Sequence, residues 1–283
     1  MQLRGLPGTC LYQEKLFSLP ESFISKPKLK KGNGQHVGPI LLFLIFYPFQ
    51  ALGILYLIPV TLGGNDYHQV IPEKVLTITR SLRHFIVEDI RSARRYLRLI
   101  DRGFPIDSCM FMELNEHTGI SEIENYLNPL LQGRDAGLMS EAGLPGIADP
   151  GAALVALAHR KEIRVVPLSG PSSVILAIIS SGLNGQNFTF NGYLPKRSTE
   201  RASRLKELER NSRDGYAQVF IETPYRNMQM LETILRVCQP DTRLCIASDI
   251  TLPGESINTL KISAWKKNVP DLKGKMSVFI IQS

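Results

Sequence analysis

The fold is decided by the stretch Ser140-Glu-Ala-Gly-Leu-Pro-Gly-Ile-Ala-Asp-Pro-Gly151, which directly follows the apolar run Gly137–Met139. Three glycines and two prolines in these twelve residues predict a long, stiff loop. Asp149-Pro-Gly then predicts the entry to a helix, with Asp149 near the N-cap and Pro150 at the first helical position. Because ligands of open α/β sheets bind beyond the carboxyl ends of the strands, this loop is the strongest candidate for a binding site.

On both sides of this loop, short β-rich runs alternate with longer amphipathic stretches. This alternation predicts a largely parallel sheet flanked by helices. The motif Ser121-Glu-Ile-Glu124 predicts a capping box at the start of a helix. The predicted strands are Ile54–Ile58, His84–Glu88, Cys109–Glu113, Gly137–Met139 and Arg164–Val166, and the predicted helices are Glu73–Ser81, Ser92–Ile100, Ser121–Leu131 and Ala152–Lys161.

A second set of elements follows, and its last strands succeed one another without helices between them, which predicts a mixed sheet. We therefore predict an α/β protein of two α/β domains, 52–166 and 167–283, and a disordered or mis-assigned extension over 1–51. The second set has strands at Phe188–Asn191, Ala217–Glu222, Arg243–Ala247, Ser256–Lys261 and Met276–Ile281, and helices near Ser172–Ser180, Glu200–Asn211 and Met228–Val237.

Composition excludes several classes of protein. The chain of 283 residues is 43% hydrophobic and 21% charged, which argues against disorder throughout. Its four scattered cysteines suit a reducing compartment, and without CxxC or HExxH spacing they predict no metal site. The net charge is +7, but residues 1–51 alone carry six basic and two acidic residues. The rest of the chain is only mildly basic, so charge alone is weak evidence for RNA binding.

The uncharged stretch Pro39–Val60 has two competing interpretations. Its length and hydropathy fit a membrane span, but its second half also fits the first strand of the sheet, and the same residues cannot be both. A strand there leaves only Pro39–Phe49, which as a helix covers about 16 Å, roughly half of a bilayer core. We favour a cytoplasmic protein without a membrane anchor.

Four more predicted strand ends carry polar or glycine-rich segments. They are Pro59–Asn65, with two adjacent glycines; Glu88-Asp-Ile-Arg91; Pro167-Leu-Ser-Gly-Pro-Ser-Ser173; and Glu222-Thr-Pro-Tyr-Arg226. Each has a structural alternative: a plain turn, acids at a helix N-terminus, or a solvated basic face formed by the arginines that follow Arg91. The turn Gly-Pro-Ser-Ser leaves free N–H groups and hydroxyls suited to a carboxylate or a ribose.

Taken in order, four of these motifs resemble a known family. They are Ser140–Gly151, Val165–Ser173, Phe190-Asn-Gly-Tyr-Leu-Pro-Lys196 and Phe220-Ile-Glu-Thr-Pro-Tyr-Arg226. The series resembles the tetrapyrrole methylase-like (class III) S-adenosylmethionine methyltransferases, and within them most the small-subunit ribosomal RNA 2′-O-cytidine methyltransferases. The resemblance covers about residues 54–283. It implies S-adenosylmethionine as methyl donor and co-substrate, bound in a cleft between two α/β domains.

Carried over by motif, the resemblance implies two groups of binding residues. The donor-binding residues are Ser140, Glu141, Ala142, Gly143, Leu144, Ser172, Ser173, Leu194 and Pro195, and the acceptor-binding residues are Thr61, Gly63, Asn65 and Arg226. Three residues depart from the family pattern: Glu141 replaces Asp, Ile90 replaces Thr, and Tyr225 replaces His.

The donor carries an activated methyl group, so transfer is an in-line displacement. A ribose hydroxyl is a poor nucleophile, so a base within hydrogen-bond reach assists it. We predict Glu88 or Asp89 as this base and Glu222 as its substitute. Arg91 and Arg226 are the predicted phosphate-binding residues.

Ribosomal RNA or the small ribosomal subunit is the expected partner, and the resemblance also implies a homodimer. The basic stretch Lys196–Arg213 fits either an RNA-contacting arm or a solvated helix. Three alternative functions stay open: methylation of a precorrin-type tetrapyrrole, donor binding without catalysis, and a membrane-anchored protein.

Overall fold

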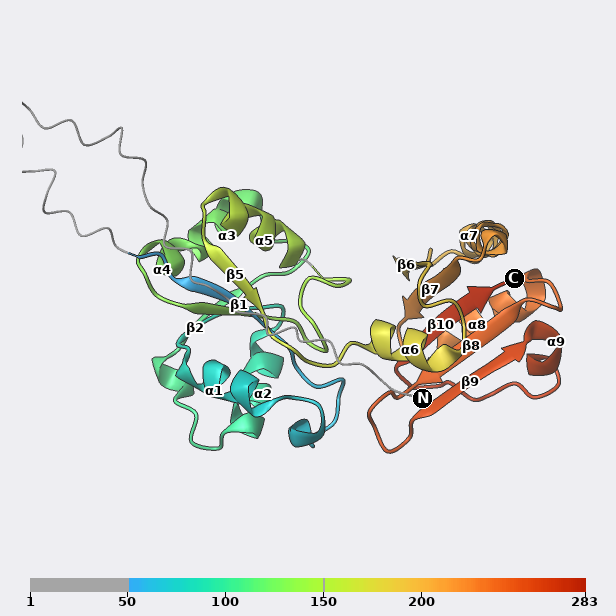
Figure 1. The fold of residues 1–283 in the computed structure, drawn as a ribbon, viewed down its shortest axis with the longest axis horizontal. Coiled ribbons are helices and arrows are strands. Elements are labelled where there is room, and N and C mark those ends of the chain that lie inside the picture. The colour runs from blue at the N-terminus through green and yellow to red at the C-terminus, as the bar shows by residue number, and fades with distance from the viewer. Residues whose placement is uncertain (1–50, 150) are drawn as a thin grey trace, which may run out of the picture. The chain divides into compact units, whose positions relative to one another are not determined.

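The computed structural model describes residues 51–149 and 151–283, which form two β-sheets (Figure 1). The first sheet has five strands in the order β3-β2-β4-β1-β5, and every neighbouring pair is parallel. Parallel neighbours require crossover connections, which accounts for the helices between successive strands. In chain order the strands are β1 (Ile54–Ile58), β2 (His84–Val87), β3 (Met110–Glu113), β4 (Ala136–Met139) and β5 (Arg164–Pro167).

Helices cover both faces of this sheet (Figure 1). Ile58 and Val87 belong to an apolar cluster with residues of α1 and α2, while Leu55 and Ile86 belong to a second cluster with residues of α3, α4 and α5. The inner strands β2 and β4 are buried almost throughout and are nearly continuous apolar runs, whereas the edge strands β3 and β5 each have two exposed residues. The helices are α1 (Glu73–Ser81), α2 (Ile90–Ile100), α3 (Ile120–Tyr126), α4 (Asn128–Leu131) and α5 (Gly151–Arg160).

The second sheet is mixed, as predicted, with five strands in the order β6-β7-β10-β8-β9. Only the β6–β7 pair is parallel. One face packs against α6, and the other packs against α7, α8 and α9. The elements are α6 (Ser173–Ser181), β6 (Phe188–Tyr193), α7 (Ser198–Asn211), β7 (Ala217–Glu222), α8 (Asn227–Val237), β8 (Arg243–Ser248), β9 (Ser256–Lys261), α9 (Ile262–Trp265) and β10 (Ser277–Gln282). Short 3-10 helices span Tyr67–Gln69, Ile106–Ser108 and Ser212–Asp214.

Two local predictions around α3 are wrong. The capping box predicted at Ser121–Glu124 does not form, because α3 begins at Ile120 with Gly119 as its N-cap. The single helix predicted over Ser121–Leu131 is instead two helices, α3 and α4. Pro129 lies in the first turn of α4, where its missing N–H removes no helical hydrogen bond.

The short helix α9 has no counterpart among the predictions, since four residues are too few to show a helical period.

The strand interpretation of the uncharged stretch is confirmed, because β1 occupies Ile54–Ile58. Residues 39–50 and the rest of the predicted extension lie outside the described residues. Within 51–149 and 151–283, no helix is long and apolar enough to cross a membrane.

The chain passes from the first sheet to the second between β5 and α6, where we predict the domain boundary. The described residues nevertheless belong to one compact unit. Leu62, which follows β1, packs in the same apolar cluster as Val174 and Ala177 of α6. A methyl group added to Gly64 would lie 3.1 Å from Leu252 Cδ2. The division into domains 52–166 and 167–283 therefore stays a prediction.

Candidate methyl-transfer site

The loop after β4 is held between the end of β1 and the segment before α6. Val60 N donates to the carbonyl of Gly143 at 2.9 Å. Gly143 has a φ of +74°, and a methyl group there would lie 3.2 Å from Leu62 Cδ2 and 3.4 Å from Pro171 O. The backbone conformation thus favours glycine at this position, and the space beside it is tight. The backbone of the loop is consequently fixed at the carboxyl ends of the strands.

Asp149 fixes the far end of this loop. Its Oδ1 accepts from Gly146 N at 2.6 Å and from Gly151 N, at the start of α5, at 3.1 Å. The side chain thus ties the loop to the helix entry that the sequence predicts. Burial raises the pKa of the Asp149 carboxyl, and the two backbone donors partly oppose this rise.

A cavity of about 250 Å³ opens beside the loop and is lined from both sheets. Its first wall is built from the loop together with the ends of β1 and β2. Its second wall is built from the start of α6 and from strands β6, β7 and β10. The lining residues are Leu62, Glu88, Ser140, Glu141, Ala142, Gly143, Leu144, Ile147, Ala148, Asp149, Ser172, Ser173, Val174, Phe190, Tyr193, Ile221, Glu222, Ile250, Met276, Ser277 and Val278.

Glu88 reaches this cavity from the end of β2. Its Oε2 accepts from the backbone N–H of Glu141 at 3.2 Å, so the carboxylate lies directly against the loop. Burial raises the pKa of Glu88, and this rise outweighs the effect of the backbone donor. The neighbouring carboxylates of Asp149 and Glu141 raise it further. A carboxylate with a raised pKa is a better proton acceptor than an ordinary glutamate.

Asp89 has a different environment, although it is the next residue. It is the N-cap of α2, and its Oδ1 accepts from Ser92 N at 2.7 Å and from Ser92 Oγ at 2.6 Å. The hydrogen bond from the Ser92 side chain holds the pKa of Asp89 below its usual range. Asp89 does not line the cavity. Its geometry fits helix capping, which is the structural alternative named for this motif.

Glu222 lies at the end of β7 and is buried. Its Oε1 accepts from Thr223 N at 2.6 Å and from Arg226 Nε at 2.9 Å, and Arg226 Nη2 bonds the same oxygen. Its Oε2 is buried without a hydrogen-bond partner, although the residue lines the cavity. A buried carboxylate oxygen without a donor is costly, so it indicates a ligand hydroxyl or amine as its partner.

The start of α6 forms the remaining polar part of the wall. Ser172 is the N-cap of the helix, and its Oγ accepts from Ile175 N at 3.4 Å. Ser172 and Ser173 both line the cavity. The predicted turn into a helix therefore lies where the motif placed it.

The cavity brings together nine of the predicted site residues. They are Glu88, Ser140, Glu141, Ala142, Gly143, Leu144, Ser172, Ser173 and Glu222. The others do not line it, namely Thr61, Gly63, Asn65, Asp89, Arg91, Leu194, Pro195 and Arg226. Leu194 is buried in the apolar cluster with α7 and α8, and Arg91 is exposed on α2. The roles proposed for all seventeen residues stay predictions.

Several lining residues were not predicted as site residues. Phe190 and Tyr193 lie in the motif Phe190–Lys196, and Ile147 and Ala148 lie in the loop Ser140–Gly151. The sequence motifs could therefore have identified all four. Ile250 and the segment Met276–Val278 had no such signal, because the pairing of β10 with β7 and β8 brings them to the cavity.

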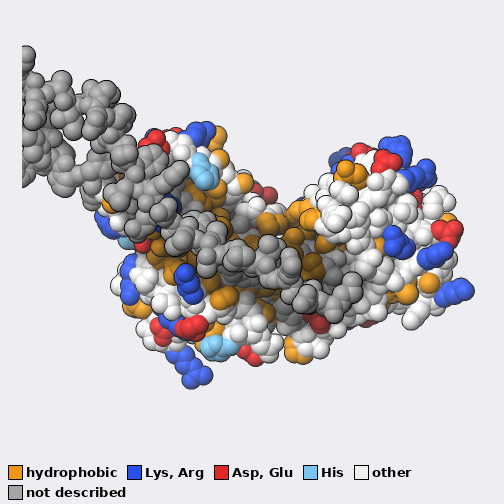
Figure 2. All heavy atoms as spheres, viewed as in Figure 1, with side chains coloured by type: hydrophobic (Ala, Val, Ile, Leu, Met, Phe, Trp, Pro, Cys, Tyr) orange, Lys and Arg blue, Asp and Glu red, His pale blue; other side chains and the backbone are white. Residues whose placement is uncertain are grey.

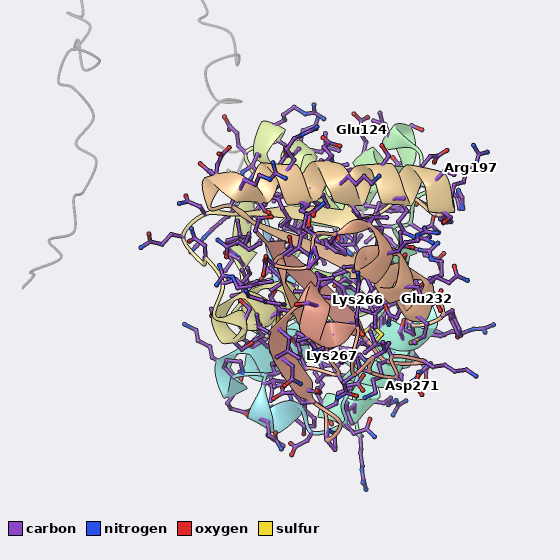
Figure 3. The ribbon with its side chains drawn as sticks, turned by 90° about the vertical axis from the view of Figure 1, so that its right-hand side faces the viewer. Glu124, Arg197, Glu232, Lys266, Lys267 and Asp271 are labelled. Carbon is purple, nitrogen blue, oxygen red and sulfur yellow. The ribbon has the colours of Figure 1, made fainter. Side chains whose placement is uncertain are left out.

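The basic stretch Lys196–Arg213 forms α7 and its ends. Lys and Arg side chains gather over this helix in Figure 2, and Arg197 projects outward at its N-terminal end in Figure 3. Arg201 is buried and donates to Thr233 Oγ1 and Lys196 O, so it does not belong to an RNA-contacting face. Arg197 and Arg204 pair with acids one turn along the helix, at 3.2 and 2.7 Å.

Two solved methyltransferase structures share the fold of this chain. The solved structure of the methyltransferase CobJ superposes with a TM-score of 0.55 at 14% identity, covering 82% of this chain and 94% of that chain. The cobalt precorrin-4 methyltransferase CbiF superposes with a TM-score of 0.51 at 15% identity, covering 84% and 98%. Identities this low show the fold alone.

No family model matches the chain. Proteins of similar sequence nevertheless identify its family. The ribosomal RNA small subunit methyltransferase I of Vibrio cholerae is 31% identical over 210 residues, covering 74% of this chain and 69% of that protein. The protein of the same name from Escherichia coli O157:H7 is 30% identical over 232 residues, covering 81% and 77%. The chain belongs to the ribosomal RNA small subunit methyltransferase I family.

Within the described residues, no group of His, Cys, Asp and Glu side chains could hold a metal ion.

Proposed function

We propose that this protein transfers the methyl group of S-adenosylmethionine to a ribose 2′-hydroxyl of small-subunit ribosomal RNA. The observation that carries the proposal is the position of Glu88, a carboxylate with a raised pKa held against the loop predicted to bind the donor. The 30 and 31% identity to ribosomal RNA methyltransferases supports RNA as the acceptor. Such an enzyme acts where ribosomes are assembled, which for a bacterial chain is the cytoplasm.

The cavity fits a positively charged nucleoside. Glu88, Glu141 and Asp149 place carboxylates along one wall, where they favour the positive sulfonium of the donor. The free Oε2 of Glu222 is available to a hydroxyl or amine of the donor. Leu62 contributes apolar surface for its less polar parts.

The bound donor supplies a methyl group on a positively charged sulfur, and this sulfur leaves readily as a neutral thioether. Glu88 takes the proton of the acceptor hydroxyl while the hydroxyl oxygen attacks the methyl carbon. The carbon–sulfur bond breaks, and its electron pair stays on sulfur, which becomes a neutral thioether. Glu88 is protonated at the end of the step and returns its proton to solvent. General-base assistance of this kind contributes about 10²- to 10⁴-fold.

The arginines divide between two roles in this proposal. Arg226 holds Glu222 through its guanidinium, so its main role is to orient that carboxylate rather than to bind phosphate. Arg91 is exposed at the start of α2, three residues from Glu88, and stays our candidate for a phosphate contact. The loop with Thr61, Gly63 and Asn65 is the proposed approach of the RNA.

Methylation of a precorrin-type tetrapyrrole is the second candidate function. It is favoured by the superposition on CobJ and CbiF, which concerns the fold. RNA is the preferred acceptor because the relatives at 30% identity and above are RNA methyltransferases.

The test is incubation of the full chain with labelled donor and small ribosomal subunits from a strain lacking the 2′-O-methyl group, followed by mapping of the labelled nucleotide. We expect label on one ribose. A precorrin offered in a parallel reaction should stay unlabelled. Label on the precorrin alone would favour the second candidate, and donor binding without transfer to either would indicate a binding protein without catalysis. Sedimentation of the same preparation tests the proposed homodimer.

Glu222→Gln should weaken donor binding by about tenfold, because the side chain loses its negative charge and the Arg226 guanidinium loses a charged partner. Calorimetric titration with the donor measures the change. Glu232→Gln, on the exposed side of α8, is the matched control and should leave the affinity unchanged. Equal affinities for all three proteins would remove Glu222 from the donor site.

A further inference from the structure

Strand β6 contains a bulge that changes which side chains face the cavity. In the parallel pairing with β7, Phe190 lies opposite Val219, but Tyr193 lies opposite Ile221. Three steps along β6 thus match two steps along β7, so β6 carries one extra residue. Gly192, inside this shift, has a φ of +61°. β-Bulges of this kind redirect side chains and are common next to active sites.

The side chain of Asn191 holds the bulge in place. Its Nδ2 donates to the carbonyl of Val219 on β7 at 3.3 Å and to the carbonyl of Thr189 at 3.0 Å. Its Oδ1 accepts from Arg204 Nη2 at 3.0 Å. The Asn191 amide therefore hydrogen-bonds the Val219 carbonyl beside the register shift. Arg204 of α7 in turn holds this amide in position. The distortion is part of the folded structure rather than a frayed strand end.

The result of the bulge is that Phe190 and Tyr193 both line the cavity. Residues three apart in a regular strand point to opposite faces of the sheet. If the same residues formed a regular strand, one of the two aromatic rings would face away from the site. Tyr193 is 53% exposed, so its ring is accessible from solvent as well as from the cavity.

The chemistry around Tyr193 suits a neutral hydrogen-bond donor. Burial raises the pKa of its phenol, and the carboxylates of Glu88 and Glu222 raise it further, with Arg226 opposing them. The phenol therefore keeps its proton at neutral pH and does not compete with Glu88 as a base. Its flat ring offers a stacking surface, which is how proteins hold unpaired RNA bases.

We infer that Tyr193 binds the acceptor, with its ring against the acceptor nucleotide and its hydroxyl donating to an oxygen of that nucleotide. The inference rests on the proposed function, because it takes a nucleotide as the acceptor. The donor is assigned to Ser140–Leu144 on the wall formed by the loop after β4, and to Ser172 and Ser173 at the start of α6. The ring of Tyr193 is half-exposed where β6 lines the cavity. Such a ring can contact a nucleotide that enters the cavity from solvent while it remains part of an RNA chain. Tyr193 is thus a substrate-binding residue that helps place the hydroxyl beside Glu88.

Replacement of the ring tests this inference. Tyr193→Ala should raise the KM for small ribosomal subunits by about ten- to hundredfold, the effect expected for the loss of one stacked base. Tyr193→Phe keeps the ring, so its KM should stay within about threefold of the wild-type value, with a lower kcat. The affinity for the donor, measured by calorimetry, should be unchanged in both variants.

Tyr216→Ala is the matched control, because Tyr216 is 46% exposed and does not line the cavity. It should behave as wild type in every assay. If wild type labels the subunits and Tyr193→Ala labels them with the same KM, the inference is overturned while the proposed function stands. A loss of donor affinity in Tyr193→Ala would assign the residue to the donor instead. No labelling by the wild-type protein would overturn the proposed function, and this inference with it.

Discussion

Glu88→Gln is expected to lower the rate of methyl transfer by about 10²- to 10⁴-fold. Donor binding should weaken by a far smaller factor, because Glu141 and Asp149 keep their carboxylates at the cavity. Glutamine keeps the size of the side chain and its carbonyl oxygen, so the hydrogen bond from Glu141 N can persist. It cannot take a proton from the acceptor hydroxyl. Single-turnover transfer from labelled donor to small ribosomal subunits measures the rate, and calorimetry measures donor affinity. A variant that turns over at the wild-type rate would exclude Glu88 as the base.

The pH dependence provides a second measurement on Glu88. Transfer requires the ionised carboxylate, so the wild-type rate should fall as pH drops through the raised pKa of Glu88, at a higher pH than for an ordinary glutamate. A raised folded-state pKa also means that Glu88 favours folding below its unfolded-state pKa, and that this contribution is lost as pH rises through the folded-state value. Glu88→Gln should therefore melt at or above the wild-type temperature near neutral pH, and the difference should shrink in acid.

Asp89→Asn separates the two adjacent acids. Asparagine also caps helices well, so the variant should fold and retain most of its activity. Asp89 accepts two hydrogen bonds from Ser92 and has a lowered pKa, which makes it a weak base. A loss of activity as large as that of Glu88→Gln would show that the two carboxylates act together.

Most strands and helices could be predicted, because they are long enough to show the spacing of apolar residues that is typical of a strand or a helix. Ile54–Ile58, Glu73–Ser81 and Ala217–Glu222 have the predicted bounds. The errors occur where a local pattern competes with its surroundings. Ser121 fits a capping residue, but the helix has already begun at Ile120. The order of the strands was not predicted, since it depends on contacts between residues far apart in the chain.

The candidate site was predictable where it consists of continuous loops. The loop Ser140–Gly151 and the turn before α6 supply many of the residues that line the cavity. The opposite side depends on the bulge in β6 and on the central position of β10 in its sheet, and neither leaves a pattern in the sequence. The difference between Glu88 and Asp89 is of the same kind. Two adjacent acids look equivalent until the start of α2 shows which one caps the helix.

Gly170→Ala is expected to lower the melting temperature by about 2–12 °C and to weaken donor binding. A methyl group at Gly170 would lie 2.1 Å from Pro59 Cβ and 2.5 Å from Pro59 Cγ, far closer than two carbon atoms can approach. Overpacking of this kind costs about 1–3 kcal/mol or more, and each kcal/mol lowers the melting temperature of a chain of this size by about 2–4 °C.

The loop of Gly170 must move, because Pro59 is fixed at the end of β1. The carbonyl of Pro59 accepts from the buried hydroxyl of Tyr96 at 3.2 Å, and the next residue, Val60, is bonded to the carbonyl of Gly143. Movement of Gly170 displaces Pro171, whose carbonyl lies in the space beside Gly143, and with it the N-cap of α6 at Ser172. Both walls predicted to bind the donor therefore shift together.

Gly119→Ala is the matched control for this prediction. A methyl group at Gly119 would meet no atom within 4 Å, and its φ of −74° suits any residue. The control should bind the donor as wild type does and melt within a few degrees of it, since alanine is only a poorer N-cap. Thermal melts with and without donor distinguish the two effects. If Gly170→Ala melts lower but binds the donor with wild-type affinity, the segment before α6 supports the fold without belonging to the donor site.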